Sequence, residues 1–143
     1  MALPAQSTER EVQVARDAID AFGRAFTDGE IDAFVDLLSE DVDYEAPSVM
    51  QHTVMKLKGR DEVRRYVAET AGDYEELAVE MKHVRDFGGG RFVMTGTWHA
   101  QPRHTGTPFG TPIGAVLDVG DGRVTRLRAF FDEQLALDAA RRD

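Results

Sequence analysis

Asp132 is the residue whose type and position are most suited to chemistry. It follows the apolar residues 129–131 near the end of the chain. A carboxylate beside phenylalanines is poorly hydrated, and lost hydration makes it a stronger proton acceptor. The same side chain could instead cap a terminal helix by accepting a backbone N–H from the first turn. The sequence leaves both roles open, and one aspartate can fill both.

His99 and Tyr44 are the candidate polar partners of Asp132. An imidazole can accept and return a proton near neutral pH, and a phenol can hold a water or a substrate oxygen. Each also has an ordinary structural interpretation, because a histidine at a strand end is often a surface residue and a strand tyrosine is often part of the core. We predict Asp132, His99 and Tyr44 as the catalytic set.

Several other chemistries are excluded by composition. The chain contains no cysteine, which removes disulfides, thiolate metal sites and cysteine nucleophiles and suits a reducing cytoplasm. None of its serines lies in a Gly-x-Ser-x-Gly motif, and its glycines form no phosphate-binding loop. The four histidines lack a metal-binding spacing. We therefore expect neither a metal nor a cofactor.

The charge of the chain argues against two classes of partner. Its 26 acidic and 17 basic residues give a net charge of −9, which repels nucleic acid and anionic membranes. No apolar run approaches the ~18 residues of a membrane span, and no signal peptide is recognisable at the start. We predict a cytoplasmic protein that binds a small molecule.

The elements that must position these residues can be read from the spacing of apolar side chains. Helical spacing predicts a first helix over about 9–27, opened by a capping box of Thr8 and Glu11, then a short helix over 31–38 and a third from about 59. Alternation predicts a strand at 42–46, and residues 48–58 read as a loop. The later strands are expected at 76–87, 91–101, 111–119 and 123–132, and a terminal helix at 133–141.

This order of elements predicts an α+β fold. The later strands are joined mainly by short turns such as Gly120–Gly122, and hairpin connections produce an antiparallel sheet. The 143 residues fit a single domain, 1–143, with its core at about 9–140. The loop at 102–110 is rich in glycine and proline, and we expect it to be mobile at the mouth of the pocket, with Phe109 as an apolar lid.

Two segments carry a resemblance to a known family. Residues 57–63 read Leu-Lys-Gly-Arg-Asp-Glu-Val, and residues 119–132 form a hairpin ending in Ala-Phe-Phe-Asp. Together with the order of elements, they resemble the nuclear transport factor 2-like superfamily, and within it the SnoaL-like, or ketosteroid-isomerase-like, bacterial proteins, over roughly 12–140. The resemblance implies a cone-shaped curved sheet wrapped around the helices, with a pocket inside. Known members include isomerases, polyketide cyclases, epoxide hydrolases, dehydratases and non-catalytic modules.

The resemblance also bears on the site. Asp132 matches the acid at the strand end of SnoaL-like cyclases and epoxide hydrolases, and Tyr44 matches a tyrosine of the hydrolases. Thr97 and His99 stand where those hydrolases keep an arginine and an aspartate, and Ala46 stands where ketosteroid isomerases keep their base. Epoxide hydrolysis and the usual steroid isomerisation are therefore disfavoured.

The prediction that remains is an isomerase, cyclase or lyase that transfers a proton on a small apolar carbonyl compound. The alternative is a non-catalytic binding or accessory module of the same fold. The residues predicted to bind the ligand are Phe22, Phe34, His52, Tyr66, Thr97, Phe109, Arg128 and Phe130. Because several strands are apolar on both faces, we also expect a homodimer formed through the convex face of the sheet.

Overall fold

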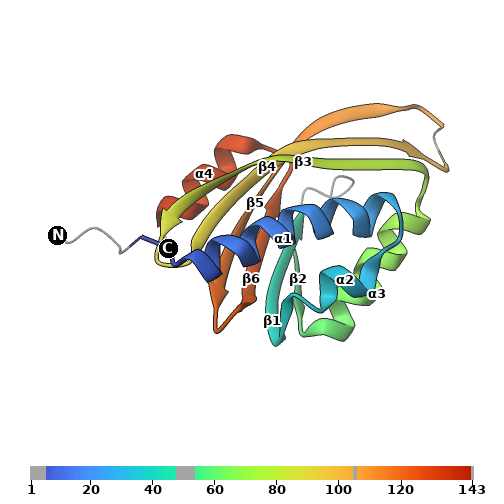
Figure 1. Ribbon diagram of the computed structural model, residues 1–143. Helices are drawn as coiled ribbons and strands as arrows, with labels where there is room; N and C mark the ends of the chain where they lie inside the picture. The colour runs from blue at the N-terminus through green and yellow to red at the C-terminus, as the bar shows by residue number, and fades with distance from the viewer. Residues whose placement is uncertain (1–5, 48–53, 105, 143) are drawn as a thin grey trace.

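The computed structural model describes residues 6–47, 54–104 and 106–142, and Figure 1 shows their arrangement. Three helices and two strands come first, and four further strands and a last helix follow. In chain order they are α1 (Glu9–Thr27), α2 (Ile31–Val35), β1 (Leu38–Pro47), β2 (Val54–Lys58), α3 (Arg60–Gly72), β3 (Tyr74–Gly88), β4 (Arg91–Pro102), β5 (Phe109–Gly120), β6 (Arg123–Phe130) and α4 (Glu133–Arg142).

The described strands form one curved, unclosed sheet in the order β2-β1-β6-β5-β4-β3 (Figure 1). The α+β fold class is confirmed. All neighbours are antiparallel except β1 and β6, which run parallel with Tyr44 beside Leu127. Strand β2 is a correction, because the sequence predicted a loop at 48–58. Its residues are held as a strand by pairing with β1, as in Tyr44 with Leu57.

Helix α1 is built as its sequence predicts and forms the inner layer. Thr8 and Glu11 complete the capping box at its start. Its buried stripe includes Ala15, Ala18 and Phe22. At Gly23 the helix approaches the edge strand β3 so closely that a Cβ would lie 2.9 Å from the Val79 carbonyl oxygen. The absence of a side chain at Gly23 therefore lets α1 pack against the sheet.

The sheet has two faces with different cover. Helices α1–α3 lie against the inner face, and α4 lies on the opposite, outer face (Figure 1). Along β4 the side chains alternate, so that Phe92 and Met94 belong to the inner core while Val93 packs with the outer cluster under α4. The face on which a strand residue lies therefore decides whether it can reach the interior.

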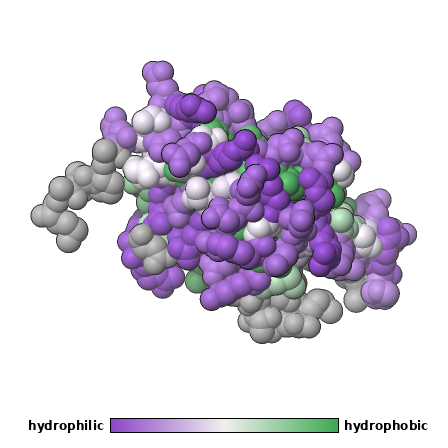
Figure 2. Space-filling model, turned by 90° about the horizontal axis from the view of Figure 1, so that it is seen from below, coloured by the Kyte–Doolittle hydropathy of each residue, from purple (hydrophilic) through white to green (hydrophobic). Residues whose placement is uncertain are grey.

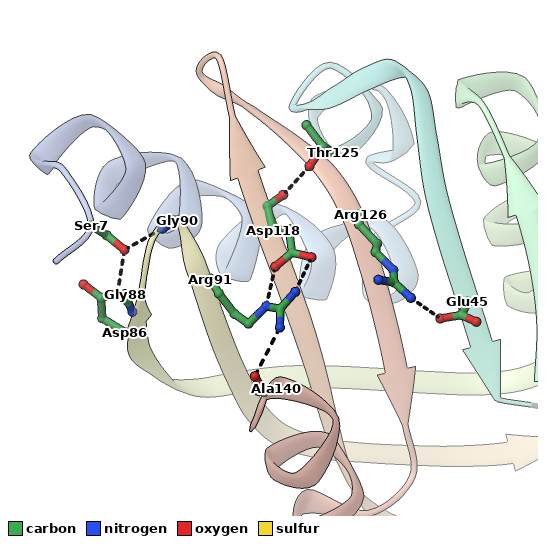
Figure 3. Close-up of polar contacts among 10 residues, drawn as sticks. All are labelled: Ser7, Glu45, Asp86, Gly88, Gly90, Arg91, Asp118, Thr125, Arg126 and Ala140. Atoms are coloured by element: carbon green, nitrogen blue, oxygen red, sulfur yellow. Dashed lines mark hydrogen bonds and ion pairs between the residues drawn. The ribbon is translucent and has the colours of Figure 1, made fainter. Parts of the chain in front are cut away.

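Helix α4 is fastened to the outer face at both ends. The Asp132 carboxylate accepts the Leu135 N–H at 2.9 Å at its start. Near its end, the Arg91 guanidinium makes a two-pronged ion pair with Asp118 and donates to the Ala140 carbonyl oxygen (Figure 3). The helix-capping interpretation of Asp132 is thus confirmed by the structure.

Candidate functional site

A cavity of about 390 Å³ lies between α3 and the inner face of the sheet. This volume falls within the range of small-molecule sites, roughly 300–1,000 Å³. Its walls come from the end of β1, from β2, from one side of α3 and from the inner face of β4, with Phe131 beyond β6. The lining residues are Pro47, Met55, Leu57, Glu62, Arg65, Tyr66, Glu69, Thr70, Asp73, Tyr74, Trp98 and Phe131.

Aromatic rings gathered around Trp98 form one wall of this cavity. Trp98 is 3% exposed. Its ring meets those of Phe26 and Phe131 at centroid distances of 5.3 Å, and that of Tyr74 at 5.9 Å. The rings of Tyr74 and Phe131 are inclined to it by 74° and 78°. Such edge-to-face contacts fix the rings as a rigid, apolar wall.

The indole N–H of Trp98 is buried and has no hydrogen-bond acceptor within the described part of the chain. The Tyr74 hydroxyl lies close enough for the indole to lower the Tyr74 pKa somewhat, although the two groups do not form a hydrogen bond of normal geometry. A buried donor without an acceptor costs roughly 1–3 kcal/mol. A ligand oxygen that reached this N–H would recover part of that cost.

The tyrosines of this region are held in their neutral form. Burial raises the pKa of Tyr74, and the nearby Asp73 carboxylate adds to the rise. Burial likewise raises the pKa of Tyr66, against the effect of a hydrogen bond with Thr70. Tyr44 lies behind Tyr66, with ring centroids 5.8 Å apart, and its burial raises its pKa well above 10. At neutral pH these hydroxyls remain protonated and can donate hydrogen bonds.

Helix α3 supplies the polar wall through residues spaced three or four apart. Glu62, Arg65, Tyr66, Glu69 and Thr70 all line the cavity, and Asp73 follows one turn beyond Glu69. The helix thus presents one stripe of mixed charge to the cavity, with more acids than bases.

Asp132 does not point into this cavity. It is exposed on the outer side of the sheet, where it caps α4. Its strand-mates Arg128 and Phe130 share that face, as alternation predicted, but it is Leu127 and Ala129 that face the inner core. Phe131, the next inward residue, reaches the cavity in place of Asp132. Arg128, Phe130 and Asp132 therefore lie on one side of the sheet, and the cavity lies on the other.

His99 also lies on the outer face. Its imidazole is exposed and packs beside Gly110, where an added Cβ would lie 2.8 Å from Nδ1. It borders a shallow groove together with Glu76 and Gln101. Thr97 precedes it on the same face, half-buried. Since Tyr44 is an inner-core residue, the structure does not bring Asp132, His99 and Tyr44 together.

The remaining predicted ligand-binding residues are distributed among three environments. Tyr66 lines the cavity. Phe22 and Phe34 pack edge to face at 5.6 Å in the core, outside the cavity lining. Phe109 lies in β5 and borders the His99 groove, so it is no lid over the aromatic cavity. His52 falls outside the described residues.

The predicted loop at 102–110 is shortened at both ends by the neighbouring strands. Strand β4 continues to Pro102 and β5 begins at Phe109. Arg103 still touches the rim, because its N–H donates to the Asp73 carbonyl oxygen and its side chain to that of Gly72. None of the described loop residues lines the aromatic cavity.

Of the twelve lining residues the sequence predicted only Tyr66, and it missed Trp98, Tyr74, Phe131 and Asp73 among the others. Trp98 lies on the face opposite His99, as alternation along a strand requires. The signal that could have found it is the alternation of β4, in which Phe92 and Met94 share the face of Trp98. An aromatic residue in register with large core residues lies on the inner side.

The described residues contain neither a metal-binding cluster nor a helix that could span a membrane. No group of three histidine, cysteine or acidic side chains there is arranged to hold a metal ion. No helix among them is long and apolar enough to cross a bilayer. The face seen in Figure 2 is mostly hydrophilic, with hydrophobic residues in small separate patches.

Comparison with known proteins gives a family and a fold. A sequence model described as a SnoaL-like domain matches residues 19–127. No curated protein sequence matches the chain.

Three solved structures illustrate the similarity. A nuclear transport factor 2-like protein from Anabaena variabilis has a TM-score of 0.72 at 15% identity, covering 92% of this chain and 96% of its own. TerC, co-crystallised with polyporic acid, has a TM-score of 0.70 at 17% identity, covering 92% and 98%. A hypothetical protein with a ketosteroid isomerase-like fold from Catenulispora acidiphila, in complex with trimethylamine, has a TM-score of 0.67 at 18% identity, covering 87% and 91%. At these identities the likeness establishes the fold alone.

Proposed function

The chain belongs to the SnoaL-like domain family, and on that premise we propose that it binds a small, largely apolar carbonyl compound in the aromatic cavity beside α3. The observation that carries the proposal is the buried indole N–H of Trp98, which lacks an acceptor among the described residues. A carbonyl oxygen would satisfy that donor, and the rings around it would bury an apolar body. Two structures of the same fold were solved with small organic molecules, one with trimethylamine and one with polyporic acid.

Proton transfer on the bound compound is the second candidate function, and one observation favours it. Asp73 lies beside Tyr74 at the cavity, and its carboxylate raises the Tyr74 pKa. A carbonyl polarised by the Trp98 N–H or the Tyr74 hydroxyl would acidify its α-carbon, and Asp73 would accept the proton. This scheme keeps the predicted isomerase or cyclase chemistry but moves the base from Asp132 to Asp73. Without the transfer, the same cavity is a binding module.

Tryptophan fluorescence tests the binding proposal directly, because Trp98 is the only tryptophan of the chain. Titration with 4-tert-butylacetophenone should quench the emission of Trp98 saturably. The same titration of free N-acetyltryptophanamide corrects for light that the ketone itself absorbs. Calorimetry on Trp98→Phe should show affinity lowered about five- to tenfold, since one hydrogen bond is lost. His99→Ala is the matched control, one residue away on the opposite face, and should bind normally. Equal loss in both variants, or no saturable quenching, would contradict the proposal.

We also propose that the chain forms a homodimer through the outer face of the sheet. Helix α4 covers part of that face, and the half-buried Thr95 and Thr97 of β4 lie on the same face. Thr97→Arg would place a charge at the centre of such a contact, where burying it is costly. Light scattering should then report a dimer for the native chain and a monomer for the variant. A monomeric native chain at micromolar concentration would rule the dimer out.

A further inference from the structure

We infer that the ligand of the aromatic cavity carries a positively charged amino group, held near the mouth by the carboxylates of α3. This inference rests on the proposed function, because it concerns the same cavity. The inference adds a substrate class to the proposed function, namely a carbonyl compound with a cationic end.

The charges that line the cavity are the first support. Three carboxylates, those of Glu62, Glu69 and Asp73, face one guanidinium, that of Arg65. Glu62 is engaged, because its side chain accepts the Lys58 N–H at 3.0 Å. Within the described residues, no ion pair joins Glu69 or Asp73 to a basic side chain. Two adjacent carboxylates therefore remain available to a cation.

The aromatic wall is the second and independent support. A cation is attracted to the face of an aromatic ring, most strongly to tryptophan, and more so where water is excluded. Trp98, Tyr74 and Phe131 all line the cavity, and their rings meet at steep angles. Tyr66 faces them from α3. Rings on several sides with carboxylates at the rim are the combination that favours an alkylammonium group over a neutral one.

The backbone at the mouth acts in the same direction. Asp73 follows the carboxyl end of α3, where the carbonyl oxygens carry the negative end of the helix dipole. Arg103 offsets part of this potential by donating to the Gly72 carbonyl oxygen. The net charge of −9 adds a weak field that draws cations toward the chain. If Arg65 instead binds an anionic group of the ligand, an anionic ligand should bind more tightly than a cationic one.

Three probes of matched shape separate these cases. They share the acetophenone body and differ in the para substituent: tert-butyl is neutral, trimethylammonium is its cationic isostere, and carboxylate is anionic. At low salt, the cation should bind about tenfold more tightly than the neutral probe, and the carboxylate more weakly than both. Part of the advantage of the cation should disappear as salt screens the rim.

Two substitutions assign the effect to the rim. Glu69→Gln combined with Asp73→Asn should lower the affinity of the cationic probe relative to that of the neutral probe by about fivefold. Glu133→Gln is the control, because it removes an exposed carboxylate on α4, and it should leave the affinities of all three probes unchanged. Equal binding of neutral and cationic probes, or tightest binding of the carboxylate, would overturn the inference while the proposed function stands. Failure of the neutral probe to bind would remove the proposed function itself.

Discussion

Trp98 and His99 are adjacent in β4, yet their side chains leave opposite faces of the sheet. Trp98 is buried among the rings of the inner cavity, and His99 is exposed beside Gly110 on the outer face. The same relationship separates Phe131, which lines the cavity, from Asp132, which caps α4. In both pairs the polar residue lies outside and the aromatic residue inside. The lining of the cavity therefore includes Trp98 and Phe131 but neither His99 nor Asp132.

Asp132 should behave as a helix cap in mutational tests. Asp132→Ala removes the acceptor of the Leu135 N–H and should lower the free energy of unfolding by about 1 kcal/mol. Asp132→Asn keeps an acceptor oxygen and should cost much less. Denaturant unfolding of both variants measures the difference. Neither should weaken the binding of a cavity ligand, and a loss of affinity in Asp132→Asn with unchanged stability would contradict this assignment.

The three tyrosines of the chain should titrate abnormally late. Tyr44, Tyr66 and Tyr74 all have a pKa raised above 10, chiefly by burial. Phenolate absorbance should therefore show no ionisation near pH 10 while the protein stays folded. Because the unfolded chain ionises first, stability is fully present below about pH 10 and falls as the pH rises above it. A tyrosine that titrates normally in the folded chain would disprove the buried arrangement.

Gly96 should be intolerant of any side chain. A Cβ at this position would lie 2.0 Å from the Glu80 carbonyl oxygen, which is backbone and cannot move aside alone. Gly96→Ala should therefore distort β3 and lower the free energy of unfolding by about 3 kcal/mol. Gly72→Ala is the matched control. A Cβ at position 72, at the end of α3, would have nothing within 4 Å, so this substitution should stabilise the folded chain by up to about 1 kcal/mol.

The partly buried pair of Arg91 and Asp118 should hold α4 on the sheet. Asp118→Asn removes the negative charge that the Arg91 guanidinium contacts at 2.7 Å and 3.0 Å. The same guanidinium also donates to the Ala140 carbonyl oxygen. We expect a loss of about 1–3 kcal/mol and faster amide exchange in α4. Asp138→Asn disrupts an exposed pair with Arg141 and should cost under about 0.5 kcal/mol. Equal effects of the two substitutions would show that burial of the pair does not matter.

Much of the architecture follows from local sequence signals. The first helix begins at its capping box and ends where predicted, because apolar spacing and the cap are local properties of the chain. The turn at Asp121 and Gly122 has the positive φ angles that a tight hairpin requires. The segments at 57–63 and 119–132 carried enough of the family pattern to indicate the fold. The short strand β2 was missed because its few residues are held extended by pairing with β1.

The candidate site was decided by tertiary packing. Alternation along β6 puts Arg128 and Phe130 on one face, because side-chain period is a property of the strand itself. Which face becomes the interior depends on where the helices pack, and apolar residues occupy both faces of this sheet. Helix α1 covers one side and α4 the other, so an apolar neighbourhood alone could not distinguish them. A shift of one position exchanges inside for outside, and only the packed structure placed Trp98 and Phe131 in the cavity.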